Sequence, residues 1–397
     1  MTSLHDVLAR RLHDLILALA TGLRYLDRYY RDSFDRIARP PIVAIVQALI
    51  NLRRPRENLE LAEERILPGE PEATRAIIAA QSAFTKTTYA NAIAERVGNT
   101  KTYGVVRGTF EVLPDLPERV RHGVFAEPGQ YPVWVRFGGP GPLSPPDMRD
   151  NGLLSVGIKL MGVEGPKLLD DEQHTQDFTG LSSPTFTTPD VIENVKLQRR
   201  LLRGTPGFYF LDPRDSHLLD AIMQGLYSRA NTSPLEVTYW STVPYLLGEG
   251  QAMRFALHPR SSARTRVPKR PGPDYLREAM ARTLAERQVE FDFKVQLQTD
   301  PHRMPIENAS VIWPERLSPP ITVARMVLGV QRFDSPEQLA FARSLSFQPW
   351  HCVADHRPLG SQNRARRVIY YELSKLRQSM NRDPRIEPGG SERFPES

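Results

Sequence analysis

Six segments between residues 103 and 299 combine an alternating apolar pattern with β-branched and aromatic residues, and they constrain the fold more than any other feature. They span residues 103–112, 132–137, 153–163, 235–243, 252–257 and 289–299. Because side chains alternate between the two faces of a sheet, each segment is typical of a strand with a buried face. Long irregular connections separate the segments, and helical patterns follow at 273–287, 336–342 and 363–381. This order predicts an α+β fold with a closed antiparallel barrel at its centre.

Helical patterns also precede the strands. Residues 3–38 have leucines at helical spacing, with Gly22 as an expected break, and we expect Pro40 and Pro41 to end this helix. A second, short helix is predicted to follow up to about residue 52, and another helix is predicted over residues 73–97.

The chain divides into three parts by composition. We expect a helical extension and linker arm over residues 1–72 and a core over residues 73–381. The remaining stretch, 382–397, is polar and rich in Pro, Gly, Glu and Ser, which predicts a disordered tail.

Composition and charge narrow the class of protein. Of 397 residues, 40% are hydrophobic and 25% are charged, which permits a large buried core. The net charge of +6 is a mild excess spread along the chain, and without a zinc-finger or RNA-binding signature it predicts no nucleic-acid partner. A single cysteine, Cys352, rules out an intramolecular disulfide and fits the cytoplasm.

The N-terminal region bears on membrane contact. The longest apolar run, residues 42–50, is shorter than the roughly 20 residues that span a bilayer. Arginines flank this run, which favours peripheral contact with a membrane surface through residues 1–56 as one interpretation. Packing of a helix on the main domain is the other interpretation.

A helical pattern near the C-terminus places Arg366 and Tyr370 one turn apart on the same face. A cation beside a tyrosine stabilises the phenolate, which is a good ligand for ferric iron. Arg367 and Tyr371 have the same spacing, so the pattern alone leaves two candidate tyrosines.

The sequence around this pair carries a family resemblance. Phe-Gln-Pro-Trp-His-Cys at 347–352, His-Arg-Pro-Leu-Gly at 356–360 and Asn-Arg-Ala-Arg-Arg-Val-Ile-Tyr at 363–370 resemble the C-terminal signature of the smaller bacterial proteins of the haem catalase superfamily. The resemblance implies a catalase-like barrel and haem b as the cofactor. It also implies that Tyr370 is the ligand of the iron and that Arg366 is its partner.

Two further stretches are similar to the same family. Glu-Arg-Val-Gly-Asn-Thr-Lys-Thr at 95–102 resembles the segment before the first barrel strand, and Val-Arg-Phe at 135–137 resembles a strand that follows. The resemblance implies that Arg96 and Arg136 bind the haem propionates, for which a guanidinium fork is well suited. It also implies that Phe137 lies near the macrocycle.

The departures from the family concern the side where peroxide binds. The family's distal histidine falls on Asn99, and its distal asparagine falls within Leu-Ser-Ser-Pro at 181–184. Asparagine cannot act as a general acid–base, and losing such a group costs about 10²–10⁴-fold in rate. We therefore expect classical catalase turnover to be impaired. Phe186 would keep an aromatic at the access channel, and Cys352 is an alternative iron ligand.

The resemblance implies a haem-binding oxidoreductase of the catalase or peroxidase type that acts on hydrogen peroxide or on an organic or lipid hydroperoxide. Asn99 and Arg366 are the catalytic candidates. One alternative is a haem-binding or sensing protein without turnover, and another is a barrel that has lost haem and serves as a scaffold. The expected partner is a small-molecule peroxide, and a homo-oligomer is compatible with the sequence.

Overall fold

Eight antiparallel strands close into a barrel in the computed structural model, which describes residues 4–56, 58–212 and 214–395. The sheet has nine strands in the described residues, of which all but β6 form the barrel: β1 (Thr102–Val112), β2 (Gly129–Gly138), β3 (Ser155–Met161), β4 (Thr175–Leu181), β5 (Tyr239–Trp240), β6 (Tyr245–Leu246), β7 (Ala252–Pro259), β8 (Val289–Leu297) and β9 (Ile321–Leu328). They pair in the order β1-β2-β3-β4-β5-β7-β8-β9, and β9 pairs back to β1. The short β5 closes the barrel because it pairs with both β4 and β7, and β6 pairs with β7 alongside. The predicted α+β barrel fold is confirmed.

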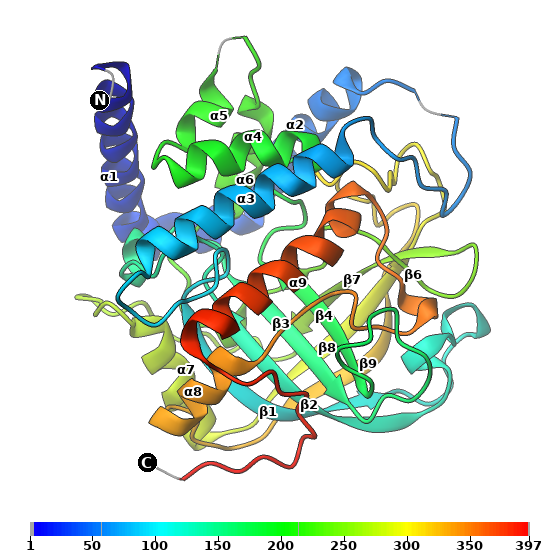
Figure 1. Cartoon of the computed structure of the whole chain (residues 1–397). Helices are drawn as coiled ribbons and strands as arrows, with labels where there is room; N and C mark the ends of the chain where they lie inside the picture. The colour runs from blue at the N-terminus through cyan, green and yellow to red at the C-terminus, as the bar shows by residue number, and fades with distance from the viewer. Residues whose placement is uncertain (1–3, 57, 213, 396–397) are drawn as a thin grey trace.

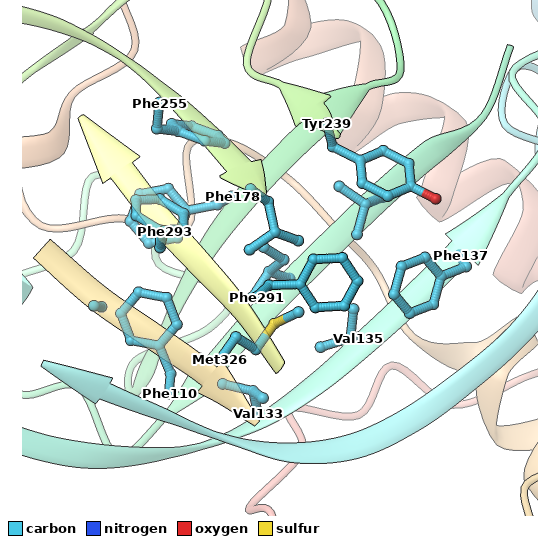
Figure 2. Close-up of a cluster of buried hydrophobic side chains, with 14 of the residues drawn as sticks. Phe110, Val133, Val135, Phe137, Phe178, Tyr239, Phe255, Phe291, Phe293 and Met326 are labelled. Carbon is cyan, nitrogen blue, oxygen red and sulfur yellow. The ribbon is translucent and has the colours of Figure 1, made fainter. Parts of the chain in front are cut away.

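Aromatic side chains fill the inside of the barrel. Figure 2 shows Phe178, Phe255 and Phe293 meeting at its centre, with ring centroids 5.0–5.1 Å apart. Burying one such ring stabilises the fold by roughly 1.5–3 kcal/mol. An eight-stranded barrel is just wide enough for side chains to fill, so this interior is a core and not a ligand cavity.

Helices cover the outside of the barrel, and Figure 1 shows α3 and α9 lying side by side across one face. The helices are α1 (Leu4–Ser33), α2 (Arg39–Arg53), α3 (Glu70–Thr88), α4 (Val191–Leu202), α5 (Gly207–Leu211), α6 (Leu218–Tyr227), α7 (Tyr275–Glu286), α8 (Pro336–Ser344) and α9 (Ser361–Asn381). One apolar cluster joins α3, α4 and α9, formed by Ala73, Ile77, Val191, Val195, Ala365 and Ile369. This cluster fixes the three helices that face the candidate site.

Several predicted boundaries were wrong. Gly22 does not break α1, which runs through it to Ser33. Pro40 and Pro41 lie in the first turn of α2, where a missing N–H costs no helical hydrogen bond, so they begin a helix and do not end one. The helix predicted over residues 73–97 ends at Thr88, and the strand predicted over 235–243 shortens to β5.

The run at residues 42–50 packs on the main domain. Val46 and Ile50 of α2 are buried against Met223 and Leu226 of α6. In contrast, leucines of α1 such as Leu19 are exposed. The side chains of residues 4–10, 12, 13 and 16, which include part of the predicted leucine stripe, lie outside the described part of the structure. None of the described helices is long and apolar enough to cross a membrane.

Candidate functional site

A cavity of about 550 Å³ lies between one end of the barrel wall and the helices α3, α4 and α9. Neighbouring ends of β2, β3 and β4 form its barrel side, through Arg136, Gly157 and Leu181. Apolar residues such as Ile77 of α3 and Leu197 of α4 form the facing side. Its volume falls within the usual range of small-molecule and cofactor sites.

Five of the predicted site residues line this cavity, although three separate segments of the chain supply them: Arg96, Asn99, Arg136, Arg366 and Tyr370. No short stretch of sequence could bring them together. The closure of the barrel and the packing of α9 on α3 create the juxtaposition.

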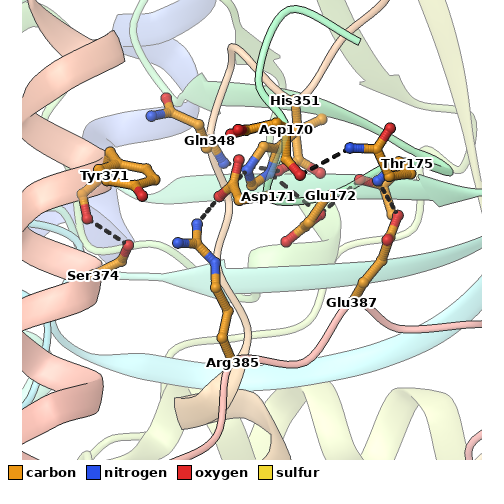
Figure 3. Close-up of polar contacts among 12 residues, drawn as sticks. Asp170, Asp171, Glu172, Thr175, Gln348, His351, Tyr371, Ser374, Arg385 and Glu387 are labelled. Carbon is orange, nitrogen blue, oxygen red and sulfur yellow. Dashed lines mark hydrogen bonds and ion pairs between the residues drawn. The ribbon is translucent and has the colours of Figure 1, made fainter. Parts of the chain in front are cut away.

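The structure distinguishes the two candidate tyrosines. Tyr370 lines the cavity, whereas Tyr371 does not. The guanidinium of Arg385 lies 5.1 Å from the ring centroid of Tyr371, and Figure 3 shows this tyrosine beside the C-terminal segment. The alternative ligand Cys352 is fully buried and does not line the cavity, and burial raises the pKa of its thiol, which disfavours a thiolate.

Phe137 does not line the cavity, contrary to the prediction that it lies beside the cofactor. Its ring packs in the barrel core, 5.8 Å from the ring of Tyr239 and 6.4 Å from that of Phe291, as Figure 2 shows. Consecutive side chains of a strand point to opposite faces. Because Arg136 faces the cavity, its neighbour Phe137 must face the core.

Three arginines gather at one part of the cavity wall, of which Arg136 and Arg377 are buried and Arg96 is partly buried. Arg96 and Arg136 were predicted, but Arg377 was missed. Burial, with the repulsion of Arg377 and Arg136, holds the pKa of Arg96 well below its usual value. Burial lowers the pKa of Arg136 to about 10. Helical spacing could have identified Arg377, because it follows Tyr370 by seven residues and therefore lies on the same face of α9.

The hydrogen bonds of these arginines leave donors unused. Nη2 of Arg96 donates to the carbonyl of Leu345 at 2.5 Å, and Nη2 of Arg377 donates to the same carbonyl at 3.2 Å. Nη2 of Arg136 donates to the carbonyl of Asn99 at 2.5 Å. Nη1 of Arg96 and Nε of Arg136 have no partner among the described residues. A buried charge is costly unless it is paired, so this arginine cluster is suited to an anionic group.

Arg366 lies over two aromatic rings of the same cavity. Its guanidinium carbon is 5.2 Å from the ring centroid of Phe186 and 5.9 Å from that of Tyr370. Nη1 of Arg366 donates to Oδ1 of Asn363 at 3.1 Å, and Nδ2 of Asn363 donates to the carbonyl of Pro244 at 2.9 Å. These bonds fix the rotation of α9 and hence the face that it presents to the cavity.

Asn99 lies at a sharp turn in the cavity wall. Gly98 and Asn99 have φ values of +87° and +54°, in the left-handed region that asparagine tolerates better than most residues. Oδ1 of Asn99 is buried and has no hydrogen-bond partner in the described part of the chain. Leu181 and Phe186 also line the cavity. Ser182 does not, because its hydroxyl accepts a hydrogen bond from the backbone N–H of Leu154 at 2.8 Å.

Comparison with known proteins supports the fold. No protein-family model matches the chain, and no curated protein is significantly similar to it. A fungal catalase crystal structure is similar with a TM-score of 0.59 and 16% identity, over 86% of this chain and 70% of the catalase. A bacterial catalase is similar with a TM-score of 0.55 and 15% identity, over the same shares of 86% and 70%. The chain therefore has the catalase-like fold.

Proposed function

We propose that the cavity binds haem b and that the protein acts on a peroxide. The observation that carries this proposal is that Tyr370 and the arginine cluster line one cavity. Haem b needs a ligand for its iron and a cationic site for the two carboxylates on one edge of its ring. Tyr370 offers the first, and Arg96, Arg136 and Arg377 offer the second.

The residues present fit this group. The unpartnered nitrogens of Arg96 and Arg136 are donors directed at no protein atom, as expected if they bind propionate oxygens. Arg366 holds a positive charge one helical turn before Tyr370 and would favour the anionic oxygen of an iron ligand. A bound haem would supply the redox-active iron at which peroxides react.

The cavity wall favours an organic hydroperoxide over hydrogen peroxide. The amide of Asn99 can donate a hydrogen bond to a bound peroxide but cannot carry a proton between its oxygens. Leu197, Leu201 and Phe210 add an apolar surface that suits a hydrocarbon chain. A lipid hydroperoxide would fit this wall, and the exposed leucines of α1 would suit contact of residues 1–56 with a lipid surface.

A second candidate function is haem binding or sensing without turnover. Among the described residues, no histidine, aspartate or glutamate lines the cavity. General acid–base catalysis relies on such groups, so their absence from this wall favours a protein that holds haem but transfers protons slowly.

One experiment tests haem binding and its ligand together. The full chain is produced with haem supplied, and its visible spectrum is compared with those of Tyr370→Phe and Tyr371→Phe. We expect a Soret band that Tyr370→Phe shifts or abolishes and that Tyr371→Phe leaves unchanged. A native protein without a Soret band would refute haem binding, and a band that responds only to Tyr371→Phe would move the ligand. Oxygen release from hydrogen peroxide and consumption of a fatty-acid hydroperoxide then separate the two functions.

A further inference from the structure

A histidine and two carboxylates meet between α4 and the segment that leads into α6. Nε2 of His217 lies 3.0 Å from Oε2 of Glu193 and 3.4 Å from an Oδ1 of Asp215. These ligand atoms all lie within 4.8 Å of one another, close enough to bind the same metal ion. A tetrahedral ion with bonds of about 2.0–2.1 Å holds its ligand atoms roughly 3.3 Å apart. The two separations from Nε2 of His217 therefore match the spacing of a transition-metal site, and the two carboxylate oxygens lie within 4.8 Å of each other.

Oε2 of Glu193 and Nε2 of His217 are buried and face each other at 3.0 Å, and neither has a further hydrogen-bond partner in the described part of the chain. Tyr209, only 4% exposed, stacks on His217 with ring centroids 4.3 Å apart and an interplanar angle of 7°. The hydroxyl of Tyr209 is also buried without a partner, in the field of Glu193 and Asp215. The hydroxyl of Tyr209 is therefore a buried polar group left unsatisfied beside the pair of Glu193 and His217, as expected if a further ligand bound here.

The surroundings have the pattern of a metal-bound histidine. Oδ2 of Asp220 faces the other ring nitrogen of His217, at 3.6 Å from Nδ1. A carboxylate in this position orients the ring and makes the coordinating nitrogen a better ligand.

Lys196 leaves the site open. Its Nζ lies 2.7 Å from Oε1 of Glu193 and 2.7 Å from Oδ2 of Asp215, so it uses the outer oxygen of each carboxylate. The inner oxygens, Oε2 and Oδ1, stay directed at His217. Two carboxylates against one ammonium leave a net negative charge that attracts a cation.

A second cluster of the same residue types shows the contrast. Glu172, Asp177 and His351, drawn in part in Figure 3, also lie close enough to share an ion. There, however, the ammonium of Lys159 pairs with both carboxylates and lies 3.4 Å from Nδ1 of His351. Lys159 thus fills the position that an ion would take, and this cluster needs no metal.

We propose that Glu193, Asp215 and His217 bind a divalent transition-metal ion, with zinc as the best match to one nitrogen and two oxygen ligands. The ion joins α4 to the segment that leads into α6. Asn194 and Leu197 of α4 line the cavity, so the ion stabilises one wall of the candidate site. Three protein ligands leave one coordination position for water.

The test is zinc binding to the chelator-treated full chain, measured by calorimetry. We expect one ion per chain, with affinity at least about 100-fold weaker in His217→Ala, which loses a ligand. Glu193→Gln keeps the size of the side chain and guards against misfolding, and it should weaken binding similarly. Asp220→Asn should weaken binding by roughly 10-fold through the orientation of the ring. Cobalt should give the intense visible absorption of a tetrahedral site, independent of haem.

The matched control is His174→Ala, because His174 is exposed and lies 4.0 Å from Glu164, a plain surface pair. This variant should bind zinc as the native chain does. Lys196→Gln should bind zinc at least as tightly, since the competing ammonium is removed. The proposal is overturned if the native chain binds no zinc, or if folded His217→Ala and Glu193→Gln bind it as tightly as the native chain.

Discussion

The direction of single side chains decides which residues belong to the cavity. On β2, alternation separates Arg136 in the cavity from Phe137 in the core. On α9, a shift of one residue separates Tyr370 from Tyr371, because successive helical residues lie about 100° apart around the axis. Spacing alone allowed either Tyr370 or Tyr371, and the structure shows that Tyr370 is the one that lines the cavity. The exclusion of Phe137 required knowing which face of β2 is covered by helices.

Asn99→His should restore proton transfer in the cavity. Histidine is among the residues that tolerate the left-handed backbone of Asn99, so the turn should survive. We expect oxygen release from hydrogen peroxide to rise at least about tenfold in haem-loaded protein, towards the 10²–10⁴-fold of general acid–base catalysis. Asn151→His introduces a histidine elsewhere on the cavity wall and should have no such effect. Equal activity in both variants would contradict the role given to Asn99.

His356 should make the fold sensitive to acid. It is fully buried, and its Nε2 accepts a hydrogen bond from the backbone N–H of Val124 at 3.0 Å. Burial lowers its pKa from 6.5 to about 4. Between these two pH values, His356 is protonated in the unfolded chain but neutral in the folded chain. This contribution is fully present above pH 6.5 and is lost as the pH falls towards 4, by up to about 3 kcal/mol.

Denaturant unfolding at a series of pH values measures this effect. His356→Gln keeps an acceptor for Val124 without a titrating group, so its stability should fall less steeply between pH 6.5 and 4. Exposed His174→Gln should follow the native curve. Parallel curves for all three proteins would show that His356 is not the group responsible.

At the scale of elements, the linker before α3 holds the start of α9. Arg364, in the first turn of α9, pairs with Glu64 at 2.7 Å, Glu70 at 2.5 Å and Glu307 at 2.9 Å. These carboxylates come from the linker, from α3 and from the segment after β8. The sequence predicted this stretch only as part of a linker arm. Its function as a clamp depends on contacts across nearly 300 positions of the chain, which no local pattern encodes.

Arg364→Gln should destabilise the fold more than the replacement of a typical charged surface residue does. The substitution removes the positive charge that neutralises three partly buried carboxylates. Breaking a buried ion pair costs about 3–5 kcal/mol. Because Arg364 keeps some solvent exposure, we expect about 2–3 kcal/mol in the free energy of unfolding, measured with denaturant. Arg75→Gln, which breaks an exposed pair with Glu72, should cost less than about 0.5 kcal/mol. Similar losses in both variants would argue against the clamp.

At the scale of the whole molecule, the C-terminal segment lies along the barrel over its described residues. Nε1 of Trp134 donates to a carboxylate oxygen of Glu392 at 2.9 Å, and the ring of Phe394 lies 6.0 Å from that of Trp134. Glu387 accepts a hydrogen bond from the backbone N–H of Gln173 at 2.8 Å. The polar composition of this segment predicted a disordered tail. Composition says nothing about contacts with distant strands, so it could not indicate these interactions.

Truncation after Arg382 should therefore lower stability without unfolding the barrel. Loss of the Phe394 packing and of the bond to Trp134 should cost about 1–3 kcal/mol. Thermal unfolding of the truncated chain, compared with a chain that lacks only residues 396–397, measures the loss. An unchanged midpoint would mean that the segment does not hold the barrel in solution.

The sequence by itself indicated six of the eight barrel strands (all but β4 and β9), the C-terminal helix and most of the named residues that line the cavity, because periodicity and short motifs are properties of neighbouring residues. It did not reveal β4, whose buried Thr175, Gln176 and Asp177 look like a loop until Lys159 of β3 pairs with Asp177. Only the tertiary structure closed the barrel through the two-residue β5, turned Arg377 into the cavity and brought Glu193 beside His217. These features arise from pairings between residues far apart in the chain, and their energy depends on the completed fold.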